Sequence, residues 1–400
     1  MDWKSLEGWR FGWPGPDTSY APRPEHWMRY GCGKLISEID QTIVEPAEVE
    51  VTSEAGYELL CSYNWQDDEE QASIIVPGGP PKWTPPPLPT QVRSDKGGFH
   101  YMDQNEYRAP GWTFEPVFQA LSYMQPQMRL NNVDVIVNGN SLRRLLDFEV
   151  RGNFEKVSTK YQPGLECSSG HHRVIRYQLG DLNCAVRFEC DAYLDDGNKT
   201  AAEAFFPSDA VVTPHSHPSQ ASNNSNTSPP IPQTAYQALP SHRTEEEQDD
   251  EERIKVIIGG GQVDSSSKLV EIKTSGIRKK VTPGHHVAQL WFGRTSYLCE
   301  AKHDYGNFQK ISCTDMKDRF KEWENRHQDS LRKLVTLLTE LKGVVSTTAY
   351  EAAVLVCENH EPIRIYESNE PMEILPQPLK AKFWGATTKN ESWEEEDMDF

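Results

Sequence analysis

Two short segments of alternating polarity, separated by a long polar stretch, most constrain how this chain can fold. In the first, residues 269–274, apolar Val270 and Ile272 alternate with polar Glu271 and Lys273. Side chains two positions apart on a strand point to the same side of a sheet. The alternation therefore predicts a strand whose polar face presents a carboxylate and an ammonium group side by side.

The second alternating segment, residues 184–194, carries Arg187, Glu189 and Asp191 on one face and apolar residues on the other. If this strand lies beside the first, its two acids converge with Glu271. Three carboxylates in one pocket repel one another unless a cation lies between them, and hard oxygen ligands select Mg²⁺ or Mn²⁺. The pattern predicts a divalent metal site, with a solvated charged face of a sheet as the alternative.

The stretch between these two segments has a different composition. Residues 195–253 are rich in Pro, Ser, Asn and Thr and end in an acidic run. Such a segment buries too little apolar surface to offset its ordering entropy, so we expect a disordered, low-complexity insertion. Because loop closure costs only about 0.6 kcal/mol per doubling of loop length, the flanking strands can still pair. The expected organisation is an irregular arm at 1–35, one discontinuous domain at 36–194 and 254–385, and an acidic tail at 386–400.

Charge and cysteine usage exclude several classes of protein. A formal net charge of -19 argues against a protein that coats nucleic acid through bulk charge, although a metal and a few local cations can handle phosphate in a deep site. The eight cysteines form no CxxC pair, which disfavours a zinc site. No secretion signal or membrane-length apolar run appears. We expect a soluble protein that is nuclear, cytoplasmic or both, is not secreted, and has no membrane partner.

Several elements are indicated by periodicity. The clearest helix is expected at 315–341, where apolar residues recur at steps of three and four, and Gly343 is expected to end it. The dipeptide Gly180-Asp181 between two alternating segments predicts a hairpin. Shorter helices are expected at 116–124 and 141–148, and further strands at 49–52, 57–63, 133–137 and 173–179. No P-loop, nucleophile elbow or Asp-Asp-x-x-Asp motif is present.

The order of the acidic motifs resembles the DXO-type decapping and exoribonuclease family, part of the broader PD-(D/E)XK nuclease class, in a divergent form similar to its fungal members. The matching residues are Glu189-x-Asp191, then Glu271-x-Lys273 followed by Thr-Ser, and Gln289 before an aromatic pair. The resemblance covers residues 131–345. It implies an α+β fold with a mixed β-sheet core flanked by helices.

The resemblance also implies a metal centre and a reaction. Mg²⁺ or Mn²⁺ would be bound by Asp191 and Glu271 directly, by Glu189 partly through water, and by the carbonyl group of Ile272. Those three acids, with Lys273 and Gln289 orienting the water and the scissile phosphate, would form the catalytic set. The implied activity is metal-dependent hydrolysis at the 5′ end of RNA, by decapping, pyrophosphohydrolysis or 5′–3′ exonuclease action. A partner protein such as an exoribonuclease is a further expectation. Four cations are expected to bind RNA: Arg143, Arg144, Lys279 and Lys280.

Two departures from the family pattern leave alternatives open. Asn138 stands where the family carries an arginine that grips RNA, and Glu166 is only a stand-in for a further metal-binding glutamate. The sequence therefore also allows a catalytically weak or inactive descendant that binds RNA or protein. A fold kept only as a scaffold for the insertion and the tails is a third alternative.

Overall fold

The computed structural model describes residues 31–40, 42–68, 71–93, 103–109, 111–144, 157–195, 254–259, 268–279, 286–358, 361–371 and 373–385. All of these described residues belong to one compact unit. The expected insertion, the acidic tail and most of the expected N-terminal arm lie outside the described residues. Strand β1 begins at Cys32, inside the range expected to be an irregular arm.

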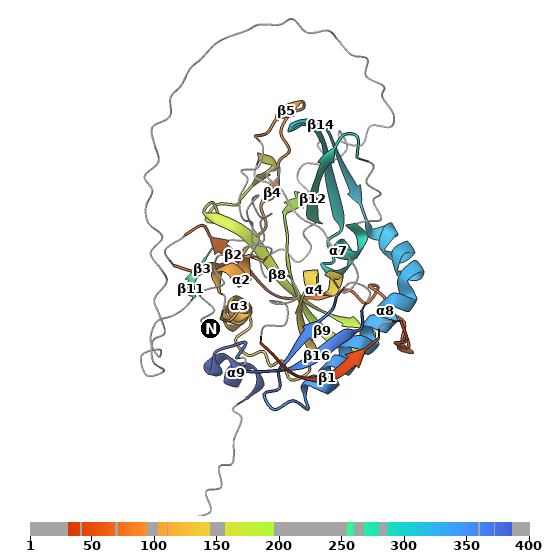
Figure 1. The fold of residues 1–400 in the computed structure, drawn as a ribbon. Helices are drawn as coiled ribbons and strands as arrows, with labels where there is room; N and C mark the ends of the chain where they lie inside the picture. The colour runs from red at the N-terminus through yellow and green to blue at the C-terminus, as the bar shows by residue number, and fades with distance from the viewer. Residues whose placement is uncertain are drawn as a thin grey trace, which may run out of the picture. The chain divides into compact units, whose positions relative to one another are not determined.

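A six-stranded sheet forms the centre of the fold (Figure 1). Its order is β11-β3-β2-β8-β9-β6, and it is mixed because β6 runs parallel to β9 and β11 parallel to β3. The predicted Gly180-Asp181 hairpin is confirmed, since β8 and β9 are antiparallel neighbours and Gly180 has a φ of 59°. The strands are β2 (Glu58–Gln66), β3 (Ser73–Val76), β6 (Val135–Asn138), β8 (Ser168–Leu179), β9 (Leu182–Glu189) and β11 (Lys255–Ile258).

A seven-stranded sheet has the order β5-β14-β13-β12-β10-β4-β7. Its central strand β12 contains the first alternating segment, and its apolar face packs against residues such as Ala301 and Ile311. The strands are β4 (Lys82–Trp83), β5 (Thr90–Gln91), β7 (Thr159–Lys160), β10 (Ala192–Leu194), β12 (Lys268–Gly276), β13 (Tyr297–Asp304) and β14 (Asn307–Asp315).

A small third sheet packs on the longest helix. Helix α8 (Lys317–Val345) confirms the clearest predicted helix, and its Leu337 contacts the sheet formed by β1, β16 and β15. Gly343 does not end α8, which continues to Val345 and has Ser346 as its C-cap. The strands are β1 (Cys32–Ile39), β15 (Ala353–Val356) and β16 (Ile363–Ser368).

Helices cover both faces of the six-stranded sheet. On one face, α7 (Val287–Phe292) and α8 pack against Ile175 and Val186 in the largest core cluster. On the other face, α3 (Glu115–Met124) and α9 (Gln377–Trp384) pack around Phe118. The remaining helices are α2 (Gln104–Arg108) and α4 (Gly139–Arg144). This arrangement confirms the predicted α+β fold with a mixed β core flanked by helices.

Two of the predicted elements differ from the structure. Residues 49–52 are not a strand, although Val51 is fully buried. The single strand predicted over residues 184–194 is broken in two, because β9 ends at Glu189 and β10 begins at Ala192. The chain leaves the six-stranded sheet and enters the seven-stranded sheet at this break, so the polar residues on its two sides do not share one continuous strand face.

Cysteines 184 and 190 are free and buried. The sequence did not predict the disulfide between Cys299 and Cys313, which face each other on β13 and β14 with their Cα atoms 4.1 Å apart. None of the helices that the structure describes has the length and hydrophobicity needed to cross a lipid bilayer.

The packing of α8 predicts how much Leu331, whose side chain is fully buried, contributes to the stability of the protein. Leu331→Ala should lower the free energy of unfolding by about 2–5 kcal/mol, because it removes buried apolar surface and leaves a cavity. The matched change on the exposed side of the helix, Glu340→Ala, should stay within about 0.5 kcal/mol of the wild type. Urea unfolding of both variants measures the difference, and equal stabilities would contradict this packing.

Candidate functional site

The two alternating segments meet at one short antiparallel pairing. In this pairing Ala192 of β10 lies opposite Val270 of β12, although the residues between them include the whole insertion. Of the two strands in the second segment, β10 pairs with β12, whereas β9 pairs with β8 and β6. The two segments therefore lie side by side as predicted, but only the last three residues of the second segment pair with the first.

Glu271 lies at the centre of a buried polar group on β12. Its side chain is 3% exposed. Its Oε1 accepts a hydrogen bond from Gln289 Nε2 at 2.6 Å and forms an ion pair with Lys273 Nζ at 2.9 Å. Gln289 lies on α7, and its Oε1 accepts from Arg143 of α4 at 3.4 Å. Three residues that the sequence assigned to catalysis are thus in direct contact, and Arg143 supports Gln289.

Asp191 links the two sheets. It lies in the break between β9 and β10, is 2% exposed, and its Oδ2 accepts from the backbone N–H of Ile272 at 2.8 Å. Burial raises the pKa of the neighbouring Cys190 thiol to about 12. That thiol is protonated near neutral pH, so it is not a nucleophile for this site.

Glu189 ends β9 directly opposite His172 of β8. Its Oε1 lies beside Gly170 of β8, 3.3 Å from the position that a Cβ atom on this glycine would occupy. Glu189 and Glu271 line the same pocket, which opens between the ends of β9, α4 and α7. The lining residues are Asp103, Asn105, Asn138, Gly139, Asn140, His172, Arg187, Phe188, Glu189, Glu271, Gln289, Gly293 and Thr295.

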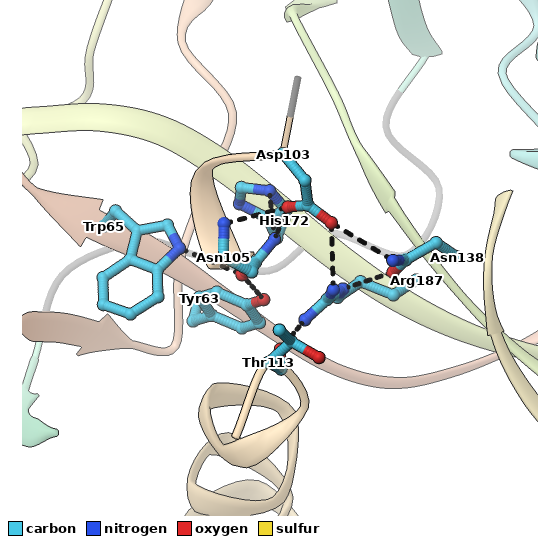
Figure 2. Close-up of polar contacts among 8 residues, drawn as sticks. All are labelled: Tyr63, Trp65, Asp103, Asn105, Thr113, Asn138, His172 and Arg187. Atoms are coloured by element: carbon cyan, nitrogen blue, oxygen red, sulfur yellow. Dashed lines mark hydrogen bonds and ion pairs between the residues drawn. The ribbon is translucent and has the colours of Figure 1, made fainter. Parts of the chain in front are cut away.

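One wall of this pocket is an ionic network centred on Arg187 (Figure 2). Asn138 Oδ1 accepts from Arg187 Nε at 2.7 Å, and Asp103 Oδ2 forms an ion pair with Arg187 NH2 at 3.3 Å. Asn138 Nδ2 also donates to Asp103 Oδ2 at 3.1 Å, and Arg187 NH1 donates to the carbonyl group of Thr113. The guanidinium group lies 4.5 Å over the ring of Phe114. Asn138 therefore holds the arginine of the neighbouring strand in place.

The other half of the same wall fixes the protonation of a histidine (Figure 2). Asn105 Oδ1 accepts from Tyr63 Oη at 2.6 Å and from Trp65 Nε1 at 3.0 Å. Since an indole nitrogen only donates, the amide orientation of Asn105 is fixed. Its Nδ2 then donates to His172 Nε2 at 3.1 Å. His172 is consequently the neutral tautomer with its proton on Nδ1, and it presents this neutral ring to the pocket.

Asp103 connects the two halves of the wall. Its Oδ1 caps α2 by accepting from the backbone N–H of Asn105 at 2.8 Å. Burial acts to raise the pKa of Asp103, but the charge of Arg187 and the hydrogen bonds from Asn105 outweigh it and hold the pKa below its ordinary value. Asp103 is therefore a carboxylate near neutral pH.

The predicted metal ligands do not form a ready-made cluster. Within the described ranges, no group of three or more His, Cys, Asp or Glu side chains is arranged so that it could hold a metal ion. The donor chemistry still fits a hard cation, because Asp191 and Glu271 are carboxylates with less than 5% of their surface exposed. Metal binding by Glu189, Asp191, Glu271 and the Ile272 carbonyl group stays a prediction.

The other predicted site residues lie apart from the pocket or outside the described part of the chain. Glu166 is exposed, and its Oε2 accepts from the backbone N–H of Gly164 at 2.8 Å. Lys279 is exposed after the end of β12. Arg144 ends α4 but its side chain is not among the described ones, and Lys280 is not described at all.

Sequence reasoning missed most of the pocket wall. Asp103, Asn105 and His172 belong to no predicted motif, and Asn138 was read only as a lost arginine. The one available signal was the Asp-x-Asn pattern at 103–105, since Asp is a favoured N-cap residue. Their partners on β2 and β9 are remote in sequence and appear only in the folded chain.

The depressed pKa of Asp103 predicts an acid-dependent contribution to stability. At pH 7 the wild type should be more stable than Asp103→Asn, because the ionised form is favoured in the fold. That difference should shrink as the pH falls below about 4, the ordinary range of an aspartate, and through the lower pKa of the folded state. Urea unfolding between pH 7 and pH 3 measures this. Asp181→Asn, in the exposed β8–β9 turn, should follow the wild type, and a difference between wild type and Asp103→Asn that does not change with pH would contradict the network.

Solved structures similar to this chain include Rai1 proteins from three organisms. S. pombe Rai1 in complex with 3′-FADP has a TM-score of 0.46 and 11% identity, over 82% of this chain and 98% of that one. Scheffersomyces stipitis Rai1 with (3′-NADP)+ and a calcium ion has a TM-score of 0.42 and 8% identity, over 84% and 92%. Candida albicans Rai1 with pU5 and Mn²⁺ has a TM-score of 0.38 and 10% identity, over 84% and 94%.

A comparison with curated protein sequences finds no match. One family model matches most of the chain, in two overlapping segments at residues 33–152 and 149–384. These segments span the pocket and all three sheets. The chain therefore belongs to the family described as a domain of unknown function, DUF8563.

Proposed function

We propose that this chain is a metal-dependent hydrolase that acts on the 5′ end of RNA at the pocket between β9, α4 and α7. One observation carries the proposal: Glu189, Glu271 and Gln289, which come from three separate elements, line the same pocket. These are residues of the motif series that the sequence shares with the DXO-type family. Their convergence supports a common chemical role rather than three independent structural ones.

Two sets of residues would act on a phosphate bound in the pocket: one would hold a metal ion, and the other orients Glu271. Glu189, Asp191, Glu271 and the Ile272 carbonyl group would hold a divalent cation. When bound, that cation would supply Lewis-acid stabilisation of the phosphate charge and an activated water. Lys273 lies 2.9 Å from Glu271, so its ammonium group orients this carboxylate and can bind a phosphate oxygen. Gln289 orients the same carboxylate from the opposite element.

His172 and Asn138 complete the environment of the substrate. His172 contributes a neutral ring and Asn138 an amide already engaged with Arg187 and Asp103. Neither side chain carries a charge, although the same wall also contains the Arg187–Asp103 ion pair. Their uncharged groups would suit the base and sugar of the first nucleotide better than its phosphate, because a phosphate seeks charged donors.

A second candidate function is binding of an RNA 5′ end without turnover. It is favoured by the contacts of Glu271, whose Oε1 already accepts from both Lys273 and Gln289. The exposed position of Glu166, away from the pocket lining, points the same way. In this case the pocket would recognise a terminal phosphate through Lys273 and would not cleave it.

Turnover by the full chain separates these two functions. Capped, triphosphorylated and monophosphorylated RNAs should each be incubated with Mn²⁺ or Mg²⁺, and the released products should be measured. At least one 5′ end should be processed, and a chelator should abolish the reaction. Glu271→Gln should lower the rate by about 10²-fold or more, exceeding the 10–100-fold cost usual for changes outside the metal ligands.

The control is Glu367→Gln, which changes an exposed strand glutamate on β16 outside the pocket and should turn over like the wild type. Calorimetric titration with Mn²⁺ gives an independent measurement, in which Asp191→Asn should remove the binding seen in the wild type. RNA binding with no turnover of any 5′ end would establish the second candidate instead. Absence of both binding and turnover would reject both.

A further inference from the structure

The polar face of the seven-stranded sheet carries a cluster of lysines that begins at the pocket. In the register of the sheet, Lys273 lies opposite Glu300, and the next residue on that face, Ser275, lies opposite Lys302. Lys302 in turn lies directly opposite Lys310 of β14. We call Lys279, Lys302 and Lys310 the lysine cluster.

The register places Lys302 and Lys310 on one face, and hydrogen bonds join Lys302 to Ser275 and to the backbone of Lys279. Lys302 Nζ donates to Ser275 Oγ at 2.6 Å and to the backbone carbonyl group of Lys279 at 3.3 Å. The opposite face of the same strands is apolar and packed, with Ile272 and Ala301 buried in a core cluster. The lysine cluster therefore lies on the side of the sheet that also bears Glu271.

The arrangement of the lysine cluster is unfavourable for the isolated protein. Like charges directly opposite each other on neighbouring strands destabilise a sheet. Among the residues that the structure describes, Lys279, Lys302 and Lys310 have no carboxylate within ion-pair distance, although Glu300 and Asp304 each lie two positions from Lys302 on β13. In a chain with a net charge of -19, this local excess of cations is not a property of the whole surface.

The distance between the pocket and the lysine cluster suits an extended polymeric ligand that enters the pocket at one end. Ser275 follows Glu271 by four residues, so the lysine cluster begins about 13 Å from Glu271 along β12, at about 3.3 Å per residue. Lys273 lies between them and is in contact with Glu271. Cations thus continue outward from Glu271 across β12, β13 and β14.

We propose that the lysine cluster binds the phosphodiester backbone of single-stranded RNA whose 5′ end occupies the pocket. This inference rests on the proposed function, and it adds to the pocket a surface that contacts the phosphates following the 5′ end. Lysines on flexible stems act as point charges, which contact phosphates without reading sequence. An anion placed between Lys302 and Lys310 also removes their mutual repulsion.

The test measures how RNA binding depends on salt, with a chelator present so that no cleavage occurs. A 5′-phosphorylated decanucleotide and the matching dinucleotide should be titrated with the full chain at several salt concentrations, using fluorescence anisotropy. For single strands the slope of log affinity against log salt changes by about 0.7 per phosphate contact. The variant Lys302→Ala/Lys310→Ala should lower that slope by about 1.4 for the decanucleotide and leave the dinucleotide unchanged.

Matched variants make the result specific. Lys321→Ala/Lys333→Ala removes two lysines of α8 and should keep the wild-type slope. Lys302→Arg/Lys310→Arg keeps both charges and should also keep it. Unchanged dinucleotide binding by Lys302→Ala/Lys310→Ala excludes a folding defect as the cause. An unchanged slope in Lys302→Ala/Lys310→Ala would overturn the proposal, and so would a preference of the lysine cluster for an acidic peptide over RNA. Since no turnover is measured, the outcome does not depend on whether the chain hydrolyses its ligand.

Discussion

The hydrogen bond from the backbone N–H of Ile272 to Asp191 Oδ2 is the contact on which the pocket depends. Asp191 lies where the chain crosses from the six-stranded to the seven-stranded sheet, and on its other side Cys190 N donates to the carbonyl group of His171. The consecutive residues Cys190 and Asp191 thus form hydrogen bonds to both sheets. A buried carboxylate that accepts a backbone N–H fixes that strand, because losing the carboxylate would leave the N–H unsatisfied. The positions of Glu189 and Glu271 relative to each other follow from this crossing.

Buried charges in the pocket wall are held by partners from distant parts of the chain. Arg187 binds Asp103 and Asn138, and Lys273 binds Glu271. Burying an ion pair gives little net stability, but removing one partner costs about 3–5 kcal/mol because the other charge is left without compensation. The network is therefore better explained as a device that fixes side-chain positions than as a source of stability. A pocket organised in this way presents its groups to a ligand with little reordering.

The sequence predicted the elements that local patterns specify and missed what depends on remote partners. The β8–β9 hairpin and α8 follow from turn chemistry and helical periodicity, and both were confirmed. The break at Cys190 and Asp191 was not predicted, because the alternation of polar and apolar residues continues through it unchanged. Asn138 looked like the loss of a phosphate-binding arginine, yet it is the parallel neighbour of Arg187 on β9 and accepts from its guanidinium group. A single sequence does not show which strands pair, so neither feature was accessible from the pattern.

The acidity of the chain and its lysine cluster have complementary consequences for binding. A protein with a net charge of -19 repels a polyanion at long range, so encounter with RNA gains nothing from bulk electrostatics. At physiological salt, charges beyond about 8 Å are largely screened, and only phosphates near Lys302 and Lys310 experience their attraction. If the chain acts on RNA 5′ ends as proposed, binding would require that the 5′ end enter the pocket and that the following phosphates reach the lysine cluster together. The charge distribution would in this way disfavour internal segments of RNA and favour free 5′ ends.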